Sequence, residues 1–301
     1  MKERDTVVVG GPASNGIGEV VAETLDLDFF AIDYRQLPDG ESYIKLPPQI
    51  AGKNVILVQS TQPPQDEKLI QLFLILDLMQ RLKARKTILV VPYLAYSRQN
   101  KEFTPGEAVS IETILKILGG LKADGLVVAE PHRPESLKVF NGKTKIIYPS
   151  SLLAKSLPQD LVKPIVISPD NGGISRADEL AKVLGASSSF LGKERNKQTG
   201  EVKITKDPET DVTGHDIIIV DDIISTGETI RLAAEELKKL GAKRIFVIAT
   251  HLLMLNGAFD KLKAAGVEKI IGSNSVPNDK ADIVDISPLV AKCCSEMLKE
   301  K

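Results

Sequence analysis

The chain contains no tryptophan, and only two of its 301 residues are cysteine. Cys293 and Cys294 are adjacent, so they do not readily bridge each other, and no pair has the spacing of metal ligands. This argues against a disulfide-stapled fold and against a cysteine metal site, and we interpret both residues as part of a packed helix. Histidine occurs only three times, which leaves few candidates for an imidazole at a functional site.

An excess of one charge and a long apolar run are also absent. The 39 basic and 40 acidic residues give a formal net charge of −1. Because they are interspersed, they argue against a dedicated nucleic-acid surface and leave local basic patches for small anions. No apolar run reaches membrane-spanning length, and the N-terminus has no signal-peptide core. We therefore expect a soluble, cytoplasmic protein with no nucleic-acid or membrane partner and a small, negatively charged ligand.

Length and hydrophobic pattern together predict an α/β fold in two domains. A chain of 301 residues exceeds the usual size of one core. Short β-rich runs alternate with segments of helical apolar spacing, which is typical of parallel sheets. We expect two doubly wound domains with mainly parallel sheets, at residues 1–148 and 149–301. The last helix, about 287–301, is a candidate to pack back on the first domain.

The predicted strands of the first domain are 6–9, 54–59, 87–91 and 125–129, and those of the second are 164–168, 216–220, 244–249 and 269–272. Helices are predicted at 174–184 and 226–240. Residues 42–46 alternate in polarity after the turn Pro38-Asp39-Gly40, which predicts a projecting hairpin strand. Ligands of open parallel sheets bind beyond the carboxyl ends of the strands, and most polar motifs of this chain follow predicted strands.

The most informative motif places two adjacent carboxylates, Asp221 and Asp222, at the end of an apolar strand and before a hydroxyl-rich turn that opens a helix. The turn residues are Ser225, Thr226, Gly227, Glu228 and Thr229. Unpaired backbone N–H groups and the helix dipole favour a phosphate at such a turn, and the two carboxylates can accept hydrogen bonds from neighbouring ribose hydroxyls. An ordinary capped helix is the alternative. The motif resembles the sugar-phosphate loop of the phosphoribosyltransferase superfamily.

Three further polar segments follow predicted strands. Arg98 and Gln99 offer a guanidinium fork and an amide for the phosphates and base edge of a nucleotide. His132 lies where an imidazole can bind a metal or contact a phosphate. The segment Asp170-Asn171-Gly172-Gly173 joins an acid that can help hold Mg²⁺ to glycines whose N–H groups can approach a diphosphate. The plainer alternatives are a solvated loop, a structural histidine and a simple turn.

The segment 192–200 is polar and cationic and has no apolar anchor, so we expect a mobile loop that can close over a substrate. Lys193 and Arg195 would then deliver positive charge to a phosphoryl group in a charge-dispersed transition state. A charged surface loop is the alternative.

Taken in order along nearly the whole chain, these motifs resemble the ribose-phosphate diphosphokinase family, most closely its archaeal members. The resemblance implies an enzyme that transfers the diphosphoryl group of Mg·ATP to ribose 5-phosphate, giving 5-phosphoribosyl 1-diphosphate and AMP. It also implies a homo-oligomer with a dimer as its minimal unit, because positions like Asp39 and Glu41 in the hairpin reach the adenine of ATP on a neighbouring subunit.

The resemblance also implies a role for each matching residue. ATP would be bound by Arg98, Gln99 and His132 together with Asp39 and Glu41. Mg²⁺ would be bound by His132 and Asp170, and the pyrophosphate loop would run through Asp170, Asn171, Gly172 and Gly173. Ribose 5-phosphate would contact Asp170, Asp221, Asp222 and the turn from Ser225 to Thr229. Lys193 and Arg195 would be the catalytic pair.

Three residues depart from the family pattern. Leu37 stands where an aromatic residue packs on adenine, Asn171 where histidine is frequent, and Glu228 where glycine is usual. Glu228 would put a negative charge beside the sugar phosphate unless it turns toward solvent. Two other functions stay open. A phosphoribosyltransferase would need neither the Arg98-Gln99 loop nor a second domain, and a non-catalytic regulatory paralogue would lose the loop cations or the metal ligands.

Overall fold

The computed structural model describes residues 5–195 and 202–299, and the chain divides into two compact units. Unit 1 comprises Met1–Tyr148 and Asp285–Lys301, and unit 2 comprises Pro149–Val284. The last helix, α8 (Ser287–Lys299), belongs to unit 1, in agreement with the expectation that it packs back on the first domain, although the range 149–301 had included it in the second. Outside residues 1–4, 196–201 and 300–301, no helix is long and apolar enough to cross a membrane.

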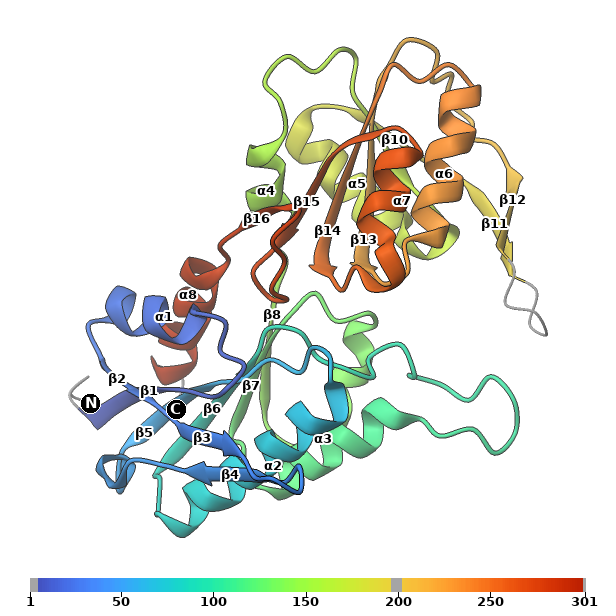
Figure 1. The fold of residues 1–301 in the computed structure, drawn as a ribbon. Helices are drawn as coiled ribbons and strands as arrows, with labels where there is room; N and C mark the ends of the chain where they lie inside the picture. Colours follow the sequence, from blue (N-terminus) through green and yellow to red (C-terminus); the bar gives the residue numbers. More distant parts are fainter. Residues whose placement is uncertain (1–4, 196–201, 300–301) are drawn as a thin grey trace. The chain divides into compact units, whose positions relative to one another are not determined.

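Unit 1 is built on a six-stranded parallel sheet (Figure 1). Its strands in spatial order are β2 (Asp28–Ala31), β1 (Thr6–Gly10), β5 (Asn54–Val58), β6 (Lys86–Val91), β7 (Gly125–Ala129) and β8 (Lys143–Ile147). The four inner strands lie within one residue of the predicted ones at each end. The edge strands β2 and β8 were not predicted, because they are partly exposed and lack a continuous apolar run.

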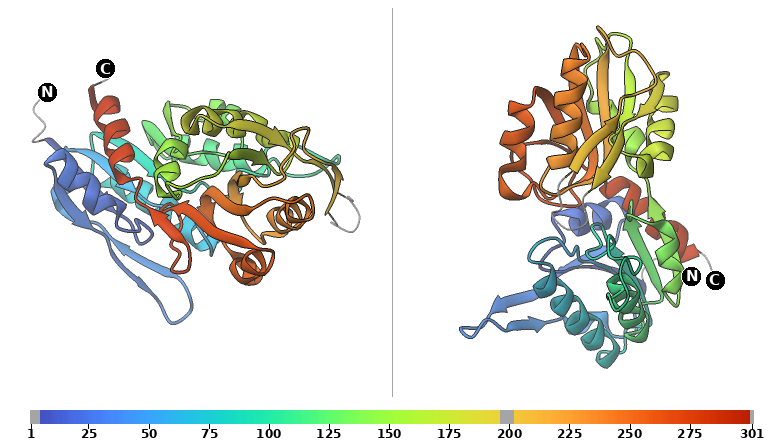
Figure 2. Two further views of the ribbon diagram at one scale, coloured as in Figure 1. Left: turned by 90° about the horizontal axis from the view of Figure 1, so that it is seen from above. Right: turned by 90° about the vertical axis from the view of Figure 1, so that its right-hand side faces the viewer.

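Helices cover both faces of this sheet. Helices α2 (Gln65–Arg81) and α3 (Ser110–Gly120) pack on one face, where Leu72 and Leu115 join strand residues such as Leu57 and Leu89 in one buried cluster. Helices α1 (Ile17–Leu25) and α8 lie side by side on the other face (Figures 1 and 2). The predicted hairpin is present as well, since β3 (Asp33–Gln36) pairs antiparallel with β4 (Ser42–Lys45) as a separate two-stranded ribbon.

Unit 2 repeats the plan with the six-stranded parallel sheet β10-β9-β13-β14-β15-β16. These strands span Ser187–Phe190, Ile165–Ser168, Asp216–Ile224, Arg244–Leu252, Val267–Ser273 and Asp282–Val284, in that order. Alternation along β13 separates two cores: Ile217 and Ile219 face α6 (Glu228–Lys239) and α7 (Ala258–Ala264), whereas Ile218 and Val220 face α4 (Ser150–Leu153) and α5 (Ile174–Leu184). Short 3₁₀ turns occur at Pro48–Ile50, Pro134–Val139, Ala154–Ser156, Asn171–Gly173 and Leu255–Gly257.

Three expectations about unit 2 need correction. Strand β13 continues to Ile224, so Asp221 and Asp222 lie inside the strand rather than after it, and α6 begins at Glu228 rather than at 226. The apolar residues Ile223 and Ile224 carry the pairing with β14 past the acid pair. The segment that begins at Gly192 also starts as a strand and not as a loop, because β11 (Gly192–Arg195) pairs antiparallel with β12 (Val202–Lys206).

Candidate functional site

The acid pair of β13 meets an arginine from the neighbouring helix. Nη1 of Arg176 lies 3.6 Å from Oδ1 of Asp221, and Nη2 lies 3.6 Å from Oδ1 of Asp222. The side chains of Arg176 and Asp222 are 17% and 5% exposed, so solvent screens this contact only weakly. Arg176 lies on the first turn of α5, which follows β9, the strand next to β13. Adjacent strand ends thus bring a cation onto two neighbouring carboxylates.

Burial raises the pKa of Asp221 well above its ordinary value, and the neighbouring Asp222 raises it further, while Arg176 acts in the opposite direction. Asp170, in the loop after β9, adds to the rise in the pKa of Asp221. Two carboxylates held so close are costly to ionise together unless a cation or hydrogen-bond donor joins them. The arrangement is therefore suited to a ligand that brings hydroxyl donors or positive charge.

The turn after β13 is shaped by Gly227. Its φ of +73° lies in the left-handed region, which favours glycine, and a Cβ there would lie 3.2 Å from Cβ of Ala258. The backbone of Ser225 is fixed by a hydrogen bond, because its carbonyl accepts one from Leu255 N–H (2.9 Å). Helix α6 then starts at Glu228, and its N-cap residue, Gly227, has no side chain to cap the first N–H groups. The turn thus presents the N-terminal end of a helix, where anions bind favourably.

Glu228 is paired within its own helix. Its carboxylate accepts hydrogen bonds from Nε (3.0 Å) and Nη2 (2.6 Å) of Arg231. This pairing lowers the pKa of Glu228. The negative charge at the start of α6 is thus compensated by a cation of the same helix.

The loop after β9 is a tight turn that the Asp170 side chain stabilises by a hydrogen bond. Oδ1 of Asp170 accepts a hydrogen bond from Gly172 N–H (2.8 Å), and the Asp170 carbonyl accepts one from Ser168 Oγ (2.6 Å). Gly173 is required by close packing, since a Cβ there would lie 2.4 Å from Ser168 Oγ and 3.2 Å from Nη1 of Arg176. Asn171 is exposed on this turn. Asp170 thus orders the glycine pair beside Arg176.

Lys193 and Arg195 lie on β11, whose backbone pairs with β12. Their side chains lie outside what the structure describes, as do residues 196–201 of the same segment. Ile204 of β12 is partly buried against the unit 2 core and anchors this hairpin.

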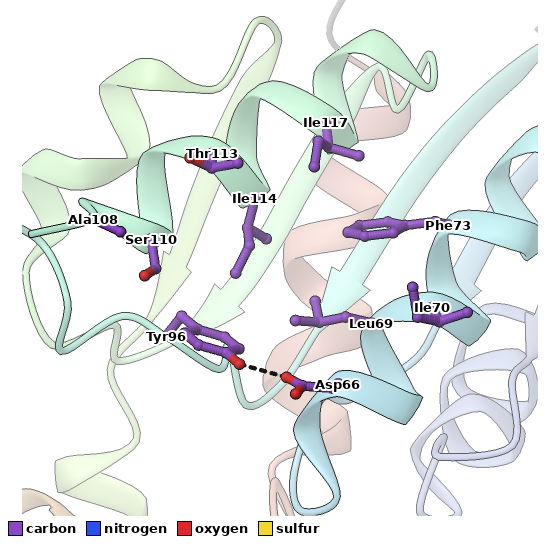
Figure 3. Close-up of a pocket in the computed structure, with 10 residues that line it drawn as sticks. All are labelled: Asp66, Leu69, Ile70, Phe73, Tyr96, Ala108, Ser110, Thr113, Ile114 and Ile117. Carbon is purple, nitrogen blue, oxygen red and sulfur yellow. Dashed lines mark hydrogen bonds between the residues drawn. The ribbon is translucent and has the colours of Figure 1, made fainter.

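In unit 1, Arg98 and Gln99 lie exposed in the turn after β6. Tyr96 begins this turn with a φ of 63°, and its hydroxyl donates a hydrogen bond to Asp66 of α2 (Figure 3). Oε1 of Gln99 accepts a hydrogen bond from Ser110 Oγ (2.6 Å) at the start of α3. The two helices thus hold the turn from both sides.

A pocket of about 350 Å³ opens between α2 and α3 beside this turn (Figure 3). Its walls are mostly apolar and include Leu69, Phe73, Ile114 and Ile117, with Tyr96 at one end. The pocket contains neither Arg98 nor Gln99 in its lining. The pocket therefore lies beside the turn, and the polar groups of Arg98 and Gln99 do not line it.

The remaining predicted residues of unit 1 lie on two further segments. His132 is partly buried between β7 and the 3₁₀ turn at Pro134–Val139. Asp39 and Glu41 are exposed at the tip of the β3–β4 hairpin, where Oδ1 of Asp39 accepts a hydrogen bond from Glu41 N–H (3.1 Å). Leu37 is half-buried at the base of that tip. In the described ranges 5–195 and 202–299, no group of three or more histidine, cysteine or acidic side chains is placed to hold a metal ion by itself.

Sequence reasoning missed Arg176. Arg176 follows the Gly172-Gly173 pair closely in the sequence, but nothing in that spacing shows that its guanidinium turns onto a neighbouring strand. His251 lies inside β14, only 4% exposed, with Nδ1 2.8 Å from Oγ of buried Ser275. His251 therefore belongs to a buried polar cluster.

Comparison with known proteins agrees with this architecture. Residues 6–121 match the model of the N-terminal domain of ribose phosphate pyrophosphokinase, and residues 151–279 match the phosphoribosyl transferase domain model. The crystal structure of phosphoribosylpyrophosphate synthetase from Mycobacterium smegmatis superposes with a TM-score of 0.89 over 99% of this chain and 100% of that one. At 24% identity, this match supports the fold.

The sequence relatives are closer. The ribose-phosphate pyrophosphokinase of Sulfurisphaera tokodaii is 42% identical over 288 residues, which cover 95% of this chain and 99% of that protein. The ribose-phosphate pyrophosphokinase of Saccharolobus solfataricus is 42% identical over 287 residues, with the same coverage. The chain belongs to the ribose-phosphate pyrophosphokinase family, and its similarity to archaeal members is confirmed.

Proposed function

We propose that the protein transfers the β,γ-diphosphoryl group of ATP to the anomeric hydroxyl of ribose 5-phosphate, giving 5-phosphoribosyl 1-diphosphate and AMP. The observation that carries the sugar-phosphate half is the juxtaposition of Asp221, Asp222 and Arg176 with an uncapped helix turn at Gly227. Carboxylates accept hydrogen bonds from sugar hydroxyls, and the turn accepts a phosphate. The family of its relatives and the match over both units support the reaction type.

Each unit has a proposed part in binding. In unit 2, Asp221 and Asp222 hold the ribose hydroxyls, the turn Ser225–Thr229 holds the 5-phosphate, and Asp170 with Asn171, Gly172 and Gly173 receives the diphosphate. In unit 1, Arg98, Gln99 and His132 bind ATP, and Asp39 and Glu41 reach the adenine of ATP on another subunit. That last role requires a homo-oligomer, with a dimer as the minimal unit.

The reaction is a single displacement. The sugar oxygen forms a bond to the β-phosphorus, and the bond from that phosphorus to the oxygen bridging the α- and β-phosphates breaks, so AMP leaves with that oxygen. We assign Lys193 and Arg195 to the charge that accumulates on the transferred group, because positioned cations stabilise such a transition state most. The hydroxyl proton passes to solvent or to a phosphate oxygen in this scheme.

The donor set fits Mg²⁺ carried by the nucleotide. Magnesium is commonly held by one or two protein carboxylates plus substrate phosphates, and a complete cage of protein ligands is not needed. Asp170 supplies a carboxylate beside the proposed diphosphate loop, and His132 supplies an imidazole on the ATP side. When bound, the ion would neutralise phosphate charge.

Phosphorus NMR of the purified protein with Mg²⁺, ATP and ribose 5-phosphate tests the proposal. We expect AMP and a sugar diphosphate to appear together, and only when both substrates are present. ADP would show an ordinary kinase. Consumption of added 5-phosphoribosyl 1-diphosphate in the presence of a nucleobase would show a phosphoribosyltransferase, and no reaction would favour a regulatory paralogue.

A further inference from the structure

The first residue of helix α6 is an acid at the turn proposed to bind the 5-phosphate. Glu228 directly follows Gly227, the residue that shapes the proposed phosphate turn, and its side chain is 45% exposed. An acidic side chain in a first helical turn stabilises the helix itself. When the same turn must accept a doubly charged phosphate, however, the carboxylate competes with the ligand for the positive end of the helix.

Arg231 neutralises this carboxylate through two hydrogen bonds. Nε lies 3.0 Å from Oε2 of Glu228, and Nη2 lies 2.6 Å from Oε1. This fork-on-fork geometry is specific to a guanidinium facing a carboxylate. The third nitrogen of the group, Nη1, donates to Oε1 of Glu235 at 2.5 Å, one turn further from the phosphate turn. Lys261 is a further cation that acts on Glu228.

An ordinary surface ion pair is the competing explanation, and α6 contains one. Nζ of Lys239 lies 2.8 Å from Oε2 of Glu236, also three residues apart, but at the opposite end of the helix. The Lys239 side chain is 70% exposed and that of Arg231 is 26% exposed. If pairs on this helix serve only its stability, loss of either cation should have similar consequences.

We propose that Arg231 is a positioning residue for ribose 5-phosphate, which holds the Glu228 carboxylate and cancels its charge at the phosphate turn. The inference rests on the proposed function, since it takes the turn Ser225–Thr229 as the 5-phosphate site. It explains how a chain with Glu228 in place of the usual glycine keeps an anion site. The net charge of the pair Glu228 and Arg231 then sets the affinity of the turn.

The test is calorimetric binding of ribose 5-phosphate without ATP, so that no turnover is needed. Arg231→Met leaves one negative charge and should weaken binding on the order of tenfold. Glu228→Gln leaves one positive charge and should tighten binding by roughly threefold. The double variant restores a neutral pair and should bind more tightly than Arg231→Met, within about threefold of the parent protein. Lys239→Met is the matched control and should leave the affinity unchanged.

Rescue separates this role from a structural one. If Arg231 only supported the fold, removing Glu228 as well would leave the damage in place, so a double variant as weak as Arg231→Met overturns the inference. Equal affinities of all variants overturn it too. Product formation by phosphorus NMR is scored separately on the same samples. A charge series that holds without formation of a sugar diphosphate contradicts the proposed function and leaves the inference about the turn standing.

Discussion

Unit 1 orders its sheet as β2-β1-β5-β6-β7-β8, and unit 2 orders its sheet as β10-β9-β13-β14-β15-β16, so corresponding strands follow one another in the same sequence. Each unit also inserts an antiparallel hairpin between its second and third sheet strands, β3–β4 in unit 1 and β11–β12 in unit 2. The residues at the strand ends nevertheless differ in kind.

Counted from the starts of β5 and β13, Gln59 and Ser60 stand where unit 2 has Asp221 and Asp222. Both unit 1 side chains are fully buried and accept hydrogen bonds from backbone N–H groups of other segments of unit 1. Oε1 of Gln59 accepts a hydrogen bond from Ala13 N–H (2.9 Å), and Oγ of Ser60 accepts one from Tyr93 N–H (3.1 Å). In unit 2 the same positions hold two carboxylates beside one arginine.

The difference shows how one topology serves two purposes. In unit 1 the polar side chains at the strand end form hydrogen bonds within the unit. One of these bonds, from Tyr93 N–H to Ser60, holds the segment that leads to Arg98 and Gln99. In unit 2 the strand end keeps charges that burial makes costly, a pattern expected where a ligand completes the site. The following predictions test this contrast, beginning with the largest expected effect.

The largest effect should come from the two inserted hairpins, because we expect only the hairpin of unit 2 to contribute a catalytic side chain. We expect Lys193→Ala to lower kcat by roughly 10²–10³-fold with little change in the KM for ATP, because its charge acts in the transition state. Lys45→Ala on β4 is the matched control in the unit 1 hairpin and should leave kcat near that of the parent. Steady-state kinetics provides the measurement, and unchanged turnover of Lys193→Ala would remove this residue from the mechanism.

The acid pair should control the sugar substrate. Asp222→Asn removes a charged acceptor and should raise the KM for ribose 5-phosphate about tenfold. The counterpart Ser60→Ala should leave that KM unchanged, since Ser60 lies buried in unit 1, where its Oγ accepts a hydrogen bond from Tyr93 N–H. Initial rates at varied ribose 5-phosphate and at varied ATP decide the matter. An effect of Asp222→Asn confined to ATP would mean that the assignment of substrates to units is reversed.

The amide that fills the unit 1 strand end should be structural. Gln59→Leu leaves the buried N–H of Ala13 without its acceptor and should destabilise unit 1 by about 1–3 kcal/mol. Hydrogen exchange with peptide resolution is the right measurement, because it reports each unit separately. Protection should fall in β1 and β5 and stay constant in β13, so an equal loss in both units would contradict a local role.

At the matching position of unit 2, a substitution should stabilise the fold instead of destabilising it. Asp221→Asn should stabilise the fold by roughly 0.5–2 kcal/mol while it weakens ribose 5-phosphate binding. The folded state raises the pKa of Asp221, so its ionisation opposes folding. The gain should be largest above the raised pKa, shrink as pH falls toward the ordinary value of 3.8, and vanish below it. Urea unfolding across this pH range checks the sign, and a gain that grows at low pH would refute the assignment.

Much of this architecture could be predicted from the sequence. Strands such as β7 are continuous apolar runs, and a fully buried parallel strand requires such a run. The acid pair and the glycine turn at Gly227 are local, so their residues identify them without knowledge of the fold. Edge strands such as β2 gave no such signal, since they bury only part of their surface.

What the sequence by itself determined is the inner strands of both sheets and the segments that carry polar motifs, because apolar periodicity and turn residues act over a few neighbouring positions. The tertiary structure alone decided which side chains meet. It turned Arg176 onto the acid pair and placed His251 beside Ser275. Contacts of this kind depend on how strands and helices are placed in space and on which rotamers fit there. The spacing of residues along the chain specifies neither the placement nor the rotamers.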